Sequence, residues 1–178
     1  MKKRFRLLGT SLLLSACVTT IDNPSTYDER ITDFLTQSDE IYESYNQFTQ
    51  SNDIDNVIII RDELTKTTEK ISTIHDKLIA IGPYQNDTSY LDAAASYLTH
   101  TIALLTNEET QLLSLRAEVA NYPDAEWTTD IELSYKEKQQ TLIDAINTQI
   151  ASDNEMIEQA QAAFAAQYGL TLSGTIQE

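Results

Sequence analysis

Apolar residues recur at alternating spacings of three and four along most of the chain, from about residue 25 to residue 168. That spacing places them on one face of an α-helix, so the pattern predicts amphipathic helices. The pattern is interrupted at the few glycines and prolines and at short polar stretches, which are typical turn positions. Four helical segments are therefore predicted, at residues 25–50, 53–81, 88–121 and 130–168.

The third segment has an apolar residue at every seventh position: Leu91, Leu98, Leu105, Leu112 and Val119. Such rows are typical of helices that pack along a common seam. Four helices joined by short turns are expected to pack antiparallel, in an up-down-up-down order. The expected fold is all-α, a four-helix bundle over residues 25–170. Because the last two segments are longer than the first two, they should project as a hairpin or bend at their ends.

No glycine or proline separates the first two segments, but the phase of their apolar positions does. Continuing the row of Ile41 and Phe48 in steps of seven leads to Asp55, whereas the second segment has its row at Val57 and Leu64. A shift of two residues rotates the apolar stripe by about 200° around a helix. A turn between the segments is therefore expected, because it returns both stripes to one core.

Short motifs predict where the helices begin and end. Thr26, Ser89 and Thr129 each precede an acidic residue by three positions, the spacing of a capping box at a helix start. Gly82, followed by proline, and Gly169 are expected to end helices, because glycine readily adopts the left-handed conformation found there.

The first seventeen residues have a different composition. A basic stretch at residues 1–6 is followed by a short leucine-rich run, and then by Ser15 and Ala16 directly before Cys17, the only cysteine. This order is typical of an export signal. The apolar run is too short to span a bilayer, which requires about 20 residues.

The residues Leu14-Ser15-Ala16-Cys17 are similar to the lipobox of bacterial lipoproteins. The resemblance implies cleavage between Ala16 and Cys17, a diacylglyceryl group on the Cys17 thiol and an N-acyl chain on its new amino group. Several acyl chains would anchor the protein stably to a membrane. Val18 in place of aspartate implies the outer membrane, facing the periplasm or the cell surface. The alternative is a chance thiol in an ordinary secretory signal.

Removing the signal leaves 162 residues with 8 basic and 28 acidic side chains, a net charge of −20. This charge argues against nucleic acid and anionic lipid headgroups as partners, because both require basic patches. The expected organisation is a signal peptide at residues 1–16, a lipidated tether at 17–24, the bundle at 25–170 and a flexible tail at 171–178.

The sequence contains no G-x-S-x-G, H-E-x-x-H, C-x-x-C-H or glycine-rich phosphate-binding motif. We therefore expect no enzymatic activity, and no cofactor besides the acyl groups on Cys17. One cluster has the residue types of a metal site, because the predicted turns bring His100 opposite residues 152–153 and near Glu69. A set of Glu69, His100 and Asp153 could bind a divalent ion. The favoured interpretation is a partly solvated histidine beside acidic neighbours, without metal.

Two further groups of residues allow more than one interpretation. Tyr122 and Trp127 lie at a predicted turn, where they could anchor a partner or simply cover the end of the bundle. Polar residues at seam positions could line a ligand cavity, or could set the helix register or lie where the bundle opens to water, which is the favoured interpretation. These seam residues are Thr67, Thr101, Glu108 and Asp153.

The order of the four segments, the Gly82-Pro83 turn and the ending at residues 164–170 resemble uncharacterised helical-bundle surface lipoproteins, which have no established activity. The predicted function is a lipid-anchored envelope protein that serves as a non-catalytic structural or protein-interaction module. The alternative is a periplasmic carrier that binds a small apolar or cationic ligand between helices. A carrier predicts a cavity of roughly 300 Å³ or more near Thr101, Glu108 and Asp153.

Overall fold

The computed structural model describes residues 21–52 and 56–172. This part of the chain is all-helical and contains no strand. Cys17, the predicted signal peptide and its cleavage site at Ala16 lie outside the described residues, as does most of the predicted tail. The helices are α1 (Pro24–Ser51), α2 (Val57–Ile79), α3 (Ser89–Leu104), α4 (Thr110–Ala120) and α5 (Thr129–Tyr168), with a π-helical turn η2 (Leu105–Glu109) and a 3₁₀ turn η3 (Asp124–Glu126).

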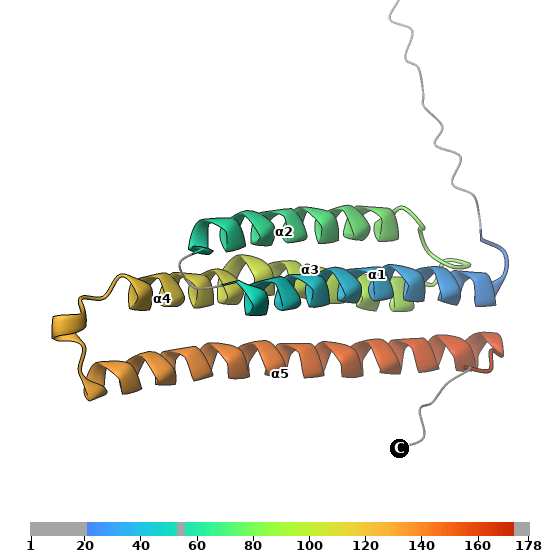
Figure 1. Cartoon of the computed structure of the whole chain (residues 1–178). Helices are drawn as coiled ribbons and strands as arrows, with labels where there is room; N and C mark the ends of the chain where they lie inside the picture. The colour runs from blue at the N-terminus through green and yellow to red at the C-terminus, as the bar shows by residue number, and fades with distance from the viewer. Residues whose placement is uncertain (1–20, 53–55, 173–178) are drawn as a thin grey trace, which may run out of the picture.

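Because η2 joins α3 to α4 without a break, the described elements form four helical rods that lie side by side (Figure 1). The rod of α3 is central, since it packs against α1, α2 and α5. At one end α4 and α5 extend beyond α1 and α2, and η3 connects them there (Figure 1). No helix among the described residues has the length and hydrophobicity needed to cross a bilayer.

Helix α1 begins earlier than the capping pattern at Thr26 predicts. Asn23 is the N-cap, and its Oδ1 accepts a hydrogen bond of 2.8 Å from the Ser25 backbone N–H. Pro24 follows at the first helical position, where its fixed φ suits a helix and its missing N–H costs nothing. The predicted capping box is therefore wrong, and Glu29 instead accepts a bond from the Ser25 hydroxyl.

The other two predicted helix starts are each shifted by one residue. Thr128 rather than Thr129 caps α5, since its hydroxyl accepts a bond of 3.3 Å from the Ile131 N–H. Thr88 rather than Ser89 is the N-cap of α3, where the Asp87 side chain accepts from a backbone N–H. A capping pattern contains several residues of similar propensity, so it locates a helix start only to within a turn.

The two predicted glycine ends are confirmed. Gly82 has a φ of +73° and Gly169 a φ of +69°, both in the left-handed region. After α5 the Leu170 N–H donates to the Ala165 carbonyl at 2.8 Å, the six-to-one bond of a Schellman motif. Helix α5 therefore stops where the sequence indicates, whereas α2 ends at Ile79, two residues before the predicted end at residue 81.

The core follows the predicted heptad row, since Leu91, Leu98, Leu105 and Leu112 are all buried. The uninterrupted third helix is not found, because η2 widens one turn, and Thr110 Oγ1 donates to the Leu105 carbonyl five residues back. A π turn inserts one residue into the helical register. This insertion fits the burial of adjacent leucines in this rod, namely the pairs Leu104–Leu105 and Leu112–Leu113.

An aromatic cluster closes the end of the bundle where α1 begins and α5 finishes. Phe164 lies 5.4 Å from Tyr27, 5.5 Å from Tyr84, 5.5 Å from Tyr90 and 4.7 Å from Tyr168, measured between ring centroids. The Tyr27 hydroxyl donates to the Gly82 carbonyl at 2.9 Å. Burial raises the pKa of Tyr27 to about 12. The described start of the chain, which leads back to the predicted tether, is therefore held at this end.

Candidate functional site

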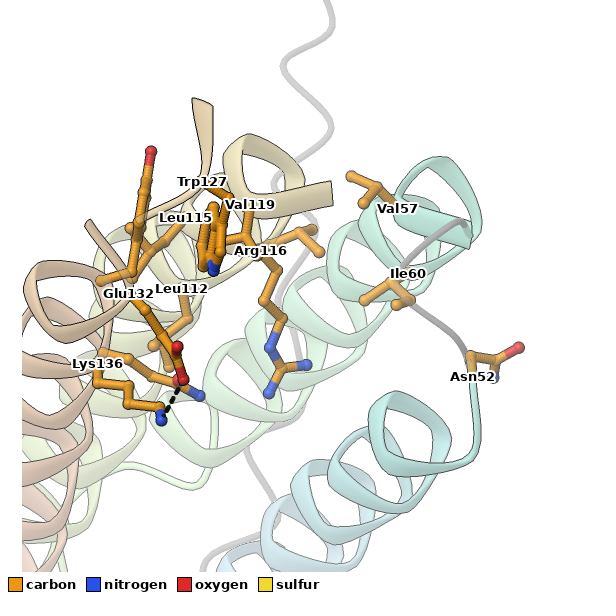
Figure 2. A pocket seen from close by; sticks show the side chains of 13 residues that line it. Asn52, Val57, Ile60, Leu112, Leu115, Arg116, Val119, Trp127, Glu132 and Lys136 are labelled. Atoms are coloured by element: carbon orange, nitrogen blue, oxygen red, sulfur yellow. Dashed lines mark hydrogen bonds and ion pairs between the residues drawn. The ribbon is translucent and has the colours of Figure 1, made fainter. Parts of the chain in front are cut away.

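A cavity of about 640 Å³ lies at the opposite end, where α4 and α5 project beyond the other helices (Figure 2). Helix α1 ends at Ser51, so it leaves this part of α4 uncovered. The wall residues come from the end of α1, the first turn of α2, α4, η3's C-cap and the first turns of α5. They are Asn52, Val57, Ile60, Leu112, Leu113, Leu115, Arg116, Val119, Trp127, Glu132, Tyr135, Lys136 and Gln139.

The floor of the cavity is apolar and belongs to the same seam that builds the core. Leu112 and Leu113 are buried on α4, and Ile60 is buried on α2. Val57 and Val119 remain partly exposed above them. The α4 face that packs on α2 thus continues into an open pocket where the facing helices stop.

One wall is aromatic. The Trp127 and Tyr135 rings are stacked, with centroids 5.8 Å apart and an angle of 14° between their planes. Tyr122 meets Trp127 edge-on at 5.4 Å. Sequence reasoning singled out Tyr122 and Trp127, and the structure places Trp127 in the cavity wall. Sequence reasoning did not single out Tyr135, which also lines this wall. The only signal for Tyr135 was its position eight residues after Trp127.

Three charged side chains line the cavity, and only two of them form an ion pair with each other. Lys136 Nζ forms a 2.6 Å ion pair with Glu132 Oε1 across one turn of α5. Arg116 forms no ion pair with any residue that the structure describes, and its side chain extends from α4 toward the space in front of Ile60 (Figure 2). Among the described residues of the lining, two side chains are positive and one is negative, so this lining has a net positive charge in a strongly acidic protein.

Arg116 also influences groups beneath the cavity. Burial raises the pKa of the Glu109 carboxyl, and a hydrogen bond from Tyr42 and the charge of Arg116 partly offset that rise. The Tyr42 hydroxyl lies 3.0 Å from Glu109 Oε1. Burial and Glu109 raise the pKa of Tyr45, and Arg116 again acts in the opposite direction. The guanidinium is thus close enough to α1 and η2 to act electrostatically, without an ion pair to either.

Sequence reasoning did not single out Arg116. The signal was its position four residues after Leu112 and three before Val119, which puts a positive charge on the apolar face of the helix. Periodicity alone could not distinguish a cavity from a place where the side chain reaches around the helix to water.

The candidate metal cluster forms only in part. His100 Nδ1 lies 2.7 Å from Asp153 Oδ1, which confirms that these residues face each other. Gln149 Nε2 donates to both Asp153 oxygens at 3.0 Å. Glu69 does not join them, since within residues 21–52 and 56–172 no group of three His, Cys, Asp or Glu side chains could hold a metal ion. The Glu69, His100 and Asp153 set is therefore wrong as a cluster, because Glu69 lies in a groove between α2 and η2.

Two of the four polar seam residues are buried, which leaves for these two the register-setting part of the favoured interpretation. Thr67 and Asp153 are buried, at 1% and 4% exposure, so neither lies where the bundle opens to water. None of three cavities in the described part of the chain, of about 640, 530 and 430 Å³, is lined by Thr101, Glu108 or Asp153. These three cavities therefore do not include the predicted ligand cavity, and the Asp153 carboxylate instead accepts from Gln149 and contacts His100.

The chain matches no protein-family model, no curated protein and no solved structure. No relative assigns a role to the cavity, so its chemistry rests on its own side chains.

Proposed function

We propose that this protein is a lipid-anchored, non-catalytic binding module of a bacterial envelope. An antiparallel, up-down-up-down four-helix bundle is attached through acylated Cys17, at the outer membrane. Its binding end lies at the α4–η3–α5 projection. Protein interaction is the primary role.

The antiparallel arrangement is supported by contacts between residues far apart in the chain. Gln161 Nε2 donates to Asp28 Oδ1 at 2.8 Å, which pairs the end of α5 with the start of α1. The His100–Asp153 contact pairs the last turns of α3 with the middle of α5. The colour order of Figure 1 is consistent with rods that alternate in direction.

The observation that carries the proposal is the separation between the two ends. The tether leads into Asn23 at the end where Tyr27 packs on Phe164. Tyr135, in the cavity wall, precedes Phe164 by 29 residues of the same helix. At 1.5 Å per residue the cavity lies about 44 Å from the anchored end. A site so far from the anchor would be accessible to a partner in the aqueous space.

Exposed apolar side chains beside the cavity favour a protein partner. Ile58 is 75% exposed and Ile59 51% exposed on the first turn of α2, and Leu133 is 53% exposed on the second turn of α5. Together with the Tyr122–Trp127–Tyr135 cluster they form an apolar and aromatic end. Aromatic residues are the usual anchors of protein interfaces.

The cavity favours a second candidate function, that of a small-ligand carrier. Its volume of about 640 Å³ lies within the range of ligand pockets, and its lining combines an apolar floor with a few polar groups. This candidate retains the carrier alternative but moves the site from the middle of the bundle to its projecting end.

Site-specific photo-crosslinking in cells that express the full chain tests the interaction role. A photoreactive residue replaces Ile58 or Leu133 at the projecting end, and Thr26 or Ala166 at the anchored end serves as the matched exposed control. Discrete protein adducts at Ile58 and Leu133 but not at the controls are expected. Adducts of equal yield at both ends, or none at the projecting end, would contradict the proposal.

The anchor is tested separately by membrane fractionation and intact mass. The wild-type chain is expected in the membrane fraction, with a mass that corresponds to a start at Cys17 plus acyl chains. Cys17→Ala is expected as an unprocessed precursor or in another fraction. A wild-type protein without acyl mass would overturn the anchor.

A further inference from the structure

The charges that line the 640 Å³ cavity indicate the class of ligand that fits it. Its apolar floor and aromatic wall suit a hydrocarbon or aromatic body. An uncharged ligand would leave the Arg116 guanidinium in the cavity without an ionic partner among the described residues. A cationic ligand would be repelled by Arg116 and would find the carboxylate of Glu132 already paired with Lys136.

We infer that this cavity binds a small amphipathic anion, with its carboxylate on Arg116 and its apolar body between Ile60, Leu112 and Trp127. Guanidinium and carboxylate groups form paired, charge-assisted hydrogen bonds, which are among the stronger polar contacts in proteins. The inference deepens the carrier function proposed above and rests on it, but it is independent of the lipid anchor.

The charge of the rest of the molecule opposes the binding of an anion. The mature chain has a net charge of −20, so its general field repels anions and attracts cations. At physiological salt that field is screened over about 8 Å, whereas a contact inside the cavity is screened much less. Preference for an anion would therefore have to come from the local groups of the cavity.

On the side of α1, the described groups leave the Arg116 guanidinium without an ion pair. Tyr42 and Tyr45 pack against Glu109, and the rise in the pKa of Glu109 opposes its ionisation. The carboxylate that acts on Arg116 from beneath the cavity is thus bonded to Tyr42 and forms no ion pair with the guanidinium. Val57 and Trp127 line the same cavity from α2 and from the turn before α5 (Figure 2).

The protein carries its own reporter for the test, because Trp127 is the only tryptophan and lines the cavity. The mature chain from residue 17, carrying Cys17→Ala so that no lipid competes, is titrated with decanoate, decanol and decyltrimethylammonium below their aggregation concentrations. Trp127 fluorescence and calorimetry are both recorded. Decanoate is expected to bind about tenfold or more tightly than decanol, the effect of one hydrogen-bonded charge pair, and the ammonium most weakly.

The variant Arg116→Gln is expected to lose the preference for decanoate and to retain its affinity for decanol. Arg30→Gln, an equal change of charge near the anchored end, is the matched control and should bind as wild type does. Circular dichroism establishes that each variant is folded, and the ranking of the three probes on the wild-type chain needs no variant at all.

Equal binding of the three probes, or unchanged decanoate binding by folded Arg116→Gln, would overturn the anion site and leave the carrier function standing. Absence of binding by every probe would overturn both. A Trp127 signal that changes with protein concentration alone, before any probe is added, would mean that a second copy fills the cavity, and would also overturn the inference.

Discussion

Replacing Phe164 with alanine tests whether the aromatic cluster at the end where α1 begins holds α5 to the rest of the bundle. Only four residues of this forty-residue helix are buried, and Phe164 is one of them, at 3% exposure. Its ring contacts four tyrosine rings from α1, α3, α5 and the loop between α2 and α3. Much of the attachment of α5 therefore depends on one side chain.

Truncating a buried phenylalanine removes about 3–5 kcal/mol from the free energy of unfolding, through lost apolar transfer and the cavity left behind. The upper part of that range is expected here, because the lost ring pairs each contribute about 0.5–1.5 kcal/mol beyond their buried area. For a chain of this size the same loss lowers the melting temperature by roughly 6–20 °C.

The assay is urea unfolding followed by circular dichroism for wild type, Phe164→Ala and Leu133→Ala. Their free energies of unfolding are compared with one common slope against urea concentration. Leu133 lies on the same helix but is 53% exposed, so its replacement should change the free energy by less than about 0.5 kcal/mol. A loss below about 1 kcal/mol for Phe164→Ala would refute the reasoning, since α5 would then be held elsewhere. A reduced slope would instead indicate that α5 detaches before the other helices unfold.

Three further outcomes follow from particular contacts. Asp153→Ala should cost about 1.5–3 kcal/mol in urea unfolding, because the buried carboxylate accepts from Gln149 and contacts His100, and an unchanged midpoint would contradict this. The pKa of Tyr27 is raised to about 12, so its stabilising contribution is complete below pH 10 and is lost as the pH rises from 10 through 12. The midpoint pH of alkaline unfolding should therefore be higher for Tyr27→Phe than for wild type, and a wild-type free energy of unfolding that stays constant from pH 10 to 12 would contradict this. Gly82→Ala should lower the free energy of unfolding by about 1 kcal/mol from backbone strain alone, since nothing lies within 4 Å of an added Cβ; a melting temperature equal to that of wild type would exclude this strain.

Hairpin geometry predicted one long-range contact correctly and one wrongly. His100 does face Asp153, because two helices joined by a short turn keep a nearly constant sum of residue numbers along their contact. Glu69 was placed by the same arithmetic across a different turn, and it lies away from His100. The loop between Glu69 and His100 contains the left-handed residues Gln85 and Asn86, which are not part of an ideal hairpin, so a register extrapolated through that loop does not hold. The π turn at η2 lies between His100 and Asp153, and their contact forms nonetheless.

Local sequence determined the parts of this protein that depend on neighbours along the chain. Helical periodicity, the heptad row from Leu91 to Leu112 and the left-handed glycines 82 and 169 are properties of a few consecutive turns, and each is found in the described structure. Helix starts were less well determined, as Asn23 and Thr128 show, because several residues in a row compete to cap the same backbone groups.

Only the tertiary structure decided what covers each helical face. Periodicity indicates that Leu112, Arg116 and Val119 share a face, but not that α1 ends at Ser51 and leaves that face open. It likewise places Asp153 on a seam without showing that Gln149 and His100 satisfy its carboxylate there. Burial is set by which helices lie alongside at a given height, and that depends on the lengths and ends of all the helices together.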